Sequence, residues 1–190
     1  VSFENAMFIE PMACCIRALN KIKVKKTNSY YISGLGSIGL MFLKLLRLEE
    51  VDKIFVSDIK NEKLKYAQKI EKCIPINALD NKELDIINQE TNNIGIDVAI
   101  VATSNMNAII KSLEVLRKGG KILIFGIPAI NSILKYDISR LVTNEISIIT
   151  SNATTEKDTK LALEYLSNNK IALEDFITHK YNIRDFKIAL

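Results

Sequence analysis

The sequence is poor in the residues that build disulfide frameworks and metal sites. Its 190 residues include no tryptophan, one histidine, three prolines and three cysteines. Cys14, Cys15 and Cys73 show no CxxC spacing, and His179 is the single imidazole available to join them. An odd number of cysteines without such spacing argues against a disulfide scaffold or a zinc finger and favours a reducing cytoplasm.

Long apolar runs and clusters of one charge are missing as well. No run approaches the roughly 18 residues that a transmembrane helix needs. The net charge is only +4, and the lysines are dispersed along the chain. Nucleic-acid binding requires basic residues gathered on one face. We therefore expect neither a membrane nor a nucleic acid as a partner.

Short apolar runs alternate with helical patterns along the chain. The helical patterns cover residues 40–48, 61–70, 81–90 and 105–117, and we expect the last to stop at the glycine pair 119–120. The apolar runs are nearly continuous, which is typical of strands buried on both faces. They read SYYIS, KIFVS, DVAIVA, KILIFG and ISIIT, with a weaker one at CIPIN. This alternation predicts an α/β fold with a doubly wound parallel sheet of six strands.

A glycine motif follows the first predicted strand and opens the next helix. Gly34, Gly36 and Gly39 form G-x-G-x-x-G, in which the glycines allow a tight turn, close approach of a pyrophosphate and close helix packing. The first helical residues, Ser37 and Ile38, then offer N–H groups to phosphate oxygens. The motif predicts a dinucleotide-binding Rossmann fold. No Lys-Ser or Lys-Thr follows the last glycine, so a nucleotide-triphosphate loop is disfavoured.

An acidic residue ends the second predicted strand. Asp58 lies 19 residues after Gly39, close to the spacing of the acid that binds the adenosine ribose in dinucleotide folds. Its negative charge favours NAD over NADP, because it repels a 2′-phosphate. Lys60 and Lys63 follow closely and weaken this preference. The alternative is that Asp58 caps the following helix.

Two later turns are further candidates for cofactor contacts. Thr103, with Ser104, ends the fourth strand at the crevice where strand order switches, and its hydroxyl is suited to a cofactor ribose. Gly126 and Ile127 follow the fifth strand. For both turns an ordinary polar loop remains an alternative.

Taken in order, these segments resemble the cofactor-binding half of zinc-dependent medium-chain dehydrogenases, closest to the sorbitol, threonine and related polyol or alcohol dehydrogenases. The sequence departs from the family pattern at Ser37, where proline is common, at Glu50, where glycine usually ends the first helix, and at KKTNS, which replaces the usual Pro-Gly-Asp type turn before the first strand. The resemblance is carried by the segments FIEPMACCIRAL, GLGSIGLM, SDIKNEKLKYA, GIDVAIVATSN, LRKGGKILIFGIP and FITHKYNI.

The resemblance implies a parent enzyme that oxidises a secondary alcohol of a small polyol with zinc and passes the hydride to NAD. It places the backbone of Gly126 and Ile127 beside the nicotinamide. Glu10 matches a possible zinc-side ligand of the full-length enzyme, but catalytic zinc needs three protein ligands. We therefore expect no catalytic residue and no zinc in this chain alone. The resemblance implies a structural role for His179.

The resemblance also implies a division of the chain. Residues 1–10 are expected to be a residual catalytic-domain segment, 11–151 the NAD-binding domain, and 152–190 a segment returning toward the catalytic domain. The chain opens with Val1 and ends within the amphipathic pattern IRDFKIAL, so we expect it to be a piece of a longer protein. Two alternatives are a regulatory nucleotide-sensing domain and, less favoured, an adenosylmethionine-dependent methyltransferase.

The segment ISIIT, Ile146 to Thr150, is expected to be the outermost strand. It has no proline or lysine to protect its edge from pairing with another chain. In the resembling family this strand pairs with its two-fold mate, so we expect a homodimer. The alternative is that a helix beginning near Thr155 covers the edge and leaves a monomer.

Overall fold

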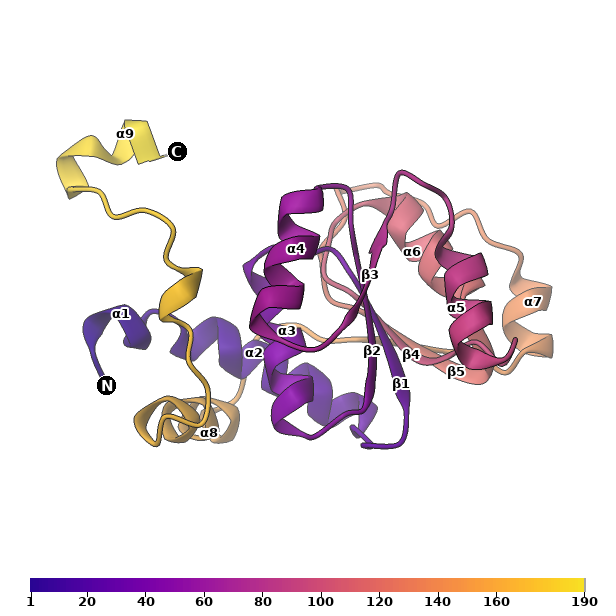
Figure 1. The fold of residues 1–190 in the computed structure, drawn as a ribbon, viewed down its shortest axis with the longest axis horizontal. Helices are drawn as coiled ribbons and strands as arrows, with labels where there is room; N and C mark the ends of the chain where they lie inside the picture. Colours follow the sequence, from indigo (N-terminus) through magenta and orange to yellow (C-terminus); the bar gives the residue numbers. More distant parts are fainter. Residues whose placement is uncertain (190) are drawn as a thin grey trace.

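In the computed structural model, which describes residues 1–189, six parallel strands form one sheet in the order β3-β2-β1-β4-β5-β6 (Figure 1). The predicted doubly wound sheet is thereby confirmed, and the strand order reverses between β1 and β4. The strands are β1 Ser29–Ser33, β2 Lys53–Asp58, β3 Ile74–Asn77, β4 Ile96–Val101, β5 Leu116–Ile124 and β6 Ser147–Thr150.

Helices cover both faces of the sheet (Figure 1). One face carries α2, α3, α4 and α8, and the other carries α5, α6 and α7. None of the helices within residues 1–189 combines the length and hydrophobicity needed to cross a bilayer. Their bounds are α1 Phe3–Ala6, α2 Ile9–Ile22, α3 Ser37–Leu48, α4 Asn61–Ile70, α5 Glu83–Thr91, α6 Met106–Glu114, α7 Ile138–Thr143, α8 Glu156–Ser167 and α9 Phe186–Ala189.

The strands are buried on both faces, as their continuous apolar runs predicted. In β1, Tyr30 and Ile32 belong to the core beneath α2 and α3, whereas Tyr31 belongs to the core beneath α5 and α6. Alternate side chains of a strand point to opposite faces, so one run fills both cores. This burial fixes the register and brings the carboxyl ends of β1, β2 and β4 to one edge of the sheet.

The structure corrects the expected end of α6. The helix ends at Glu114, and the chain enters β5 at Leu116. Gly119 and Gly120 therefore lie inside a strand and do not stop a helix. Gly119 has φ +71°, and a Cβ on Gly120 would lie 2.8 Å from the Arg117 carbonyl oxygen, so the pair forms an irregularity in the strand. Leu116 is already paired with Ile96 before this irregularity.

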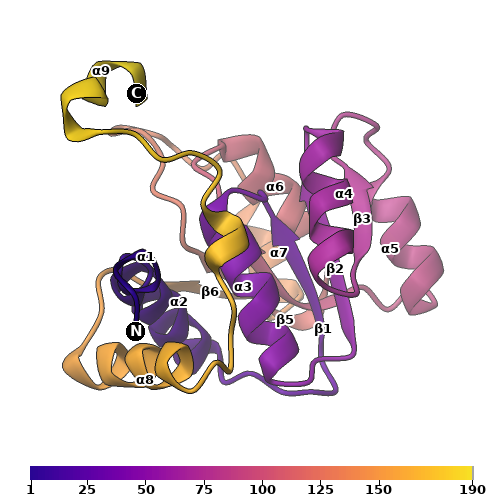
Figure 2. The ribbon, with the colours of Figure 1, turned by 60° about the vertical axis from the view of Figure 1, so that its left-hand side comes forward.

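The segment after β6 returns to the sheet. Thr155 caps α8 reciprocally with Asp158, and α8 lies alongside α2 (Figure 2). Ala162, Leu166, Ile171 and Leu173 complete the core on that face. The predicted amphipathic segment forms α9, which lies away from the sheet, while Leu190 lies outside the described residues.

Candidate nucleotide-binding site

The glycine turn connects β1 to α3 with little space for side chains. Gly34 has φ +95°, which favours glycine, and its N–H donates to the Ser57 carbonyl oxygen at 2.8 Å. A Cβ on Gly39 would lie 1.9 Å from the Gly34 carbonyl oxygen. Gly39 thus allows α3 to begin directly against the turn, as the motif predicted.

The first turn of α3 is open to a ligand. A Cβ on Gly36 would meet no atom within 4 Å, so the backbone has free space beside it. No side chain within residues 1–189 caps this helix end. The N–H groups of Ser37 and Ile38 have no partner within an α-helix, because they precede its first internal hydrogen bond. This end of α3 therefore fits the pyrophosphate of a dinucleotide.

Asp58 is joined to the glycine turn. Its Oδ2 accepts a hydrogen bond from the Leu35 N–H at 2.8 Å, and its Oδ1 accepts one from the Lys60 N–H at 3.0 Å. The Lys63 ammonium lies 3.5 Å from Oδ2. The side chain of Asp58 is only 8% exposed. Lys60 is itself the N-cap residue of α4, and no side chain within residues 1–189 caps this helix end, so Asp58 does not cap α4 and that alternative is wrong.

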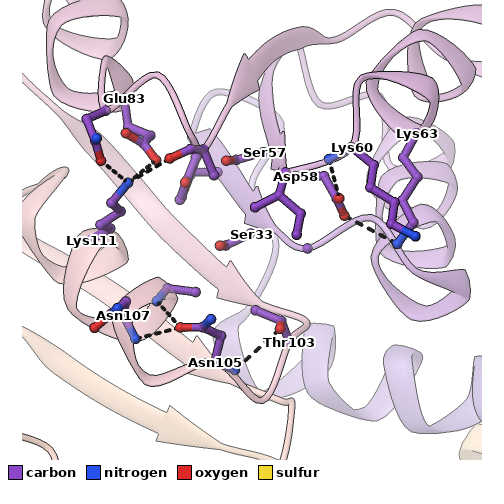
Figure 3. A pocket seen from close by; sticks show the side chains of 16 residues that line it. Ser33, Ser57, Asp58, Lys60, Lys63, Glu83, Thr103, Asn105, Asn107 and Lys111 are labelled. Atoms are coloured by element: carbon purple, nitrogen blue, oxygen red, sulfur yellow. Dashed lines mark hydrogen bonds and ion pairs between the residues drawn. The ribbon is translucent and has the colours of Figure 1, made fainter.

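A cleft of about 420 Å³ opens beside this carboxylate. Gly34, Asp58, Lys63 and Thr103 line it, so the structure brings these four predicted residues together. The Thr103 hydroxyl accepts a hydrogen bond from the Asn105 N–H at 3.3 Å. Figure 3 shows Asp58 on one side of the cleft and Thr103 below it. Gly36, Ser37 and Lys63 line a neighbouring hollow at the start of α3.

The far end of the cleft carries an ion pair that the sequence patterns did not reveal (Figure 3). The Lys111 ammonium donates to the Ala78 carbonyl, the Asn81 amide oxygen and the Glu83 carboxylate, each at 2.9 Å. The Glu83 side chain is 5% exposed. No spacing rule in the sequence links Lys111 to Glu83, because their contact depends on how α6 packs beside α5.

Two serines, Ser33 and Ser57, also line the cleft and were not predicted. A signal for them exists, since Ser33 ends β1 and Ser57 stands next to the end of β2. Polar residues at the carboxyl ends of buried parallel strands point to the edge where ligands bind. The same criterion identified Asp58.

The turn after β5 lies outside both hollows. A Cβ on Gly126 would lie 2.3 Å from the Thr103 carbonyl oxygen, so glycine is needed there for the close contact of two strand ends. Its N–H donates to the Val101 carbonyl oxygen at 3.0 Å. Ile127 is exposed. These contacts account for Gly126 by packing and leave its predicted role beside the nicotinamide as a prediction.

Glu10 stands near the start of α2 without companions for a metal ion. Its Oε1 accepts a hydrogen bond from the Cys14 thiol at 3.2 Å. Burial, together with this carboxylate, raises the pKa of Cys14 to about 11. Within residues 1–189, no three histidine, cysteine, aspartate or glutamate side chains gather as ligands for one metal ion. The residues present therefore do not fit a catalytic zinc.

His179 lies on the exposed C-terminal segment. Its Nδ1 is 3.0 Å from the Thr178 hydroxyl, and its ring stacks with that of Tyr181 at a centroid distance of 6.1 Å. It lines neither of the two hollows beside the glycine turn.

Known proteins with similar sequences span the chain from end to end. D-arabinitol dehydrogenase 1 of Uromyces fabae is 30% identical over 192 residues, covering 98% of this chain and 54% of that protein. Sorbitol dehydrogenase of Bacillus subtilis is 29% identical over 192 residues, covering 100% of this chain and 53% of the relative. The chain thus spans about half the length of the curated relatives it matches.

The fold has a close counterpart in an alcohol dehydrogenase of Escherichia coli solved with NADH. The two align with a TM-score of 0.87 at 19% identity, over 100% of this chain and 55% of that one. The family model described as zinc-binding dehydrogenase matches residues 37–168, which include α3, β2 and the part of the cleft lining from Ser57 to Lys111. The match covers most of the chain, which therefore belongs to the zinc-binding dehydrogenase family, and the resemblance inferred from its sequence is confirmed.

Proposed function

We propose that the chain is the NAD-binding part of a zinc-dependent dehydrogenase that oxidises a secondary alcohol of a small polyol. The observation that carries this proposal is Asp58, held at the end of β2 against the glycine turn and beside an open cleft. Membership of the dehydrogenase family and the polyol dehydrogenases among its relatives support the reaction class.

The predicted residues of the glycine turn and of the cleft have separate tasks in this proposal. The N–H groups at Gly36, Ser37 and Ile38 bind the pyrophosphate, and Asp58 accepts hydrogen bonds from the adenosine ribose. Lys63 and Thr103 flank that ribose. These contacts hold the cofactor across the sheet edge where the strand order reverses. Bound NAD supplies the hydride acceptor, which the side chains of this chain cannot provide.

The catalytic half of the reaction is assigned to residues beyond this chain. We propose residues 11–151 as the cofactor domain, with 1–10 and 152–190 connecting it to a catalytic domain. Glu10 is then a zinc-side ligand in the full-length enzyme only. The chain alone is proposed to bind NAD without oxidising an alcohol. Its three free cysteines agree with a cytoplasmic location.

We further propose a homodimer through β6. Ser147, Ile148 and Thr150 are exposed at this sheet edge, and α8 packs on α2. The chain leading to β6 also exposes large apolar side chains, which favour contact with a second apolar surface. These side chains are Ile127, Ile130, Ile133, Ile138 and Val142.

The test of the cofactor proposal is calorimetric titration with NADH and NADPH. We expect the protein to bind NADH at least about tenfold more tightly, because a 2′-phosphate beside the Asp58 carboxylate places like charges together. Asp58→Asn keeps the shape and removes the charge, so it should reduce the preference. Lys63→Gln removes the ammonium 3.5 Å from the carboxylate and should increase it.

Thermal unfolding of each variant provides the control for folding. Equal affinity for both cofactors in the wild type contradicts the role of Asp58, as does an Asp58→Asn variant with an unchanged preference. Failure to bind either dinucleotide contradicts the proposed function as a whole.

A further inference from the structure

The floor of the cleft is formed by a polar pair of residues from β1 and β2, whereas the preceding pair in these two strands is apolar. Ser33 and Ser57 are paired in register between β1 and β2, one step beyond the pair Ile32 and Val56. Strand side chains alternate between faces, so both serines lie on the face of Tyr31, which belongs to the core beneath α5 and α6. Figure 3 shows both serine hydroxyls between Asp58 and the Lys111–Glu83 pair.

Ser57 has an unsatisfied hydroxyl at this floor. The residue is 1% exposed, and its Oγ lies near the Tyr31 hydroxyl but makes no hydrogen bond of good geometry with it or with another described residue. Asn5, Ser112 and Ser151 also carry a buried polar atom without a partner, but of the four only Ser57 lines the cleft. A buried hydroxyl without a partner destabilises a protein, so a retained one requires an explanation.

The walls of the cleft suit a flat ring. Ile59 directly follows Asp58 and is 58% exposed, although it is a large apolar residue. Ala78 and Ala108 add small apolar side chains to the lining. The Lys111–Glu83 pair closes the far end. A heterocyclic base attached to a ribose at Asp58 would enter between these walls and reach the serine floor.

We propose that the Ser57 hydroxyl forms a hydrogen bond with the polar edge of the adenine base, which makes Ser57 a determinant of cofactor affinity. The inference rests on the proposed NAD-binding function. A hydroxyl both donates and accepts, so it can pair with a ring nitrogen or with the amino group of the base. Ser57 thus has no well-formed hydrogen bond in the free protein and gains one when the base enters.

Ser57→Ala tests this assignment through two measurements with opposite expectations. In the free protein the melting temperature should stay unchanged or rise, because the substitution removes an unsatisfied polar group. The affinity for NADH and for AMP should fall about fivefold to twentyfold, since both ligands carry the base and lose its hydrogen bond. A merely structural serine would instead lower the melting temperature and leave affinity unchanged.

Ser112 supplies a matched control. It is 0% exposed, its Oγ also lacks a partner, and it lies on α6 outside the cleft lining. Ser112→Ala should therefore leave the affinity for NADH and AMP unchanged. Ser57→Cys, which replaces the hydroxyl by a thiol that is a weaker hydrogen-bond donor, repeats the affinity loss if alanine disturbs folding.

The outcomes separate this inference from the proposed function. If the wild type binds neither NADH nor AMP, both are overturned. If it binds NADH and a folded Ser57→Ala variant binds it equally well, only the role of Ser57 is overturned. A loss of affinity shared by Ser112→Ala overturns it too, because the effect would then not arise in the cleft.

Discussion

At the scale of single residues, Asp97 joins three strands at the edge of the sheet opposite the cleft. Its Oδ2 accepts hydrogen bonds from the Ser29 N–H at 2.8 Å and the Ser29 hydroxyl at 2.9 Å, and its Oδ1 accepts one from Arg117 at 2.7 Å. Partial burial alone would raise the pKa of Asp97, but these three bonds outweigh it and lower the pKa. The charged form is thus favoured by folding.

We expect Asp97→Asn to reduce the free energy of unfolding by about 1.5 kcal/mol at pH 7, because hydrogen bonds to a charged acceptor are lost. A lowered folded-state pKa stabilises the protein above the unfolded value near 3.9 and ceases to do so as pH falls through the folded value. The difference between variant and wild type should therefore shrink below about pH 4. Urea unfolding of both proteins from pH 3 to 7 measures this difference in the free energy of unfolding.

The exposed Asp80 provides the comparison for this experiment. Asp80→Asn should change the free energy of unfolding by less than about 0.5 kcal/mol, as surface substitutions generally do. A constant difference between Asp97→Asn and wild type at all pH values would show that the carboxylate charge is not what matters.

The sequence predicted the position of a residue where local geometry determines it. Gly34 and Gly39 follow from the turn they form, and Asp58 was identified by its spacing from the turn. Ser57 and the Lys111–Glu83 contact depend on which elements lie side by side, which spacing along the chain does not reveal. The cleft could therefore be located from the sequence, while most of its lining could not.

At the scale of elements, the residue that follows α3 is poorly suited to its backbone conformation. Glu50 follows this helix with φ +56°, a left-handed conformation that costs a residue with a Cβ about 1–2 kcal/mol. Related dehydrogenases are expected to carry glycine here, on the resemblance drawn from the sequence. Glu50 pairs with Lys26 at 2.9 Å, but both side chains are well exposed, so the pair contributes little.

We expect Glu50→Gly to stabilise the protein by about 0.5–1 kcal/mol, because glycine adopts the left-handed conformation without strain. Two effects oppose this gain but are smaller: a surface ion pair is lost, and glycine gives the unfolded chain greater conformational freedom. Glu50→Ala removes the same ion pair but keeps the Cβ, so it should give no such gain. Thermal unfolding compares the two. Equal stability of both variants would mean that the backbone conformation at this position carries no strain.

The helices and strands were predictable to the extent that burial follows from local sequence. The residues 61–70 form α4 within the expected bounds, and SYYIS forms β1. The Gly119-Gly120 pair was misassigned because glycine both ends helices and permits irregular strands. The choice depends on the pairing of Leu116 with Ile96, which is a tertiary contact.

At the scale of the whole molecule, the edge strand β6 is the place where a second copy would bind. In the described part of the chain β6 pairs only with β5, so one of its edges keeps unpaired N–H and C=O groups. An apolar strand without proline or lysine is a template for another strand. A two-fold contact of this edge with itself would join two sheets and is the commonest symmetry among oligomers.

We therefore expect the protein to run as a dimer of twice its 21.4 kDa mass in light scattering at micromolar concentration. Ile148→Lys should give monomers, because Ile148 is 43% exposed on β6 and a lysine there sets like charges face to face across the two-fold axis. Leu163 on α8 is also 43% exposed, so Leu163→Lys adds the same charge at equal exposure away from the edge and should leave the dimer intact. A monomeric wild type, or an Ile148→Lys variant that stays dimeric, would show that β6 is not the interface, whereas monomers from both lysine variants would point to added charge in general.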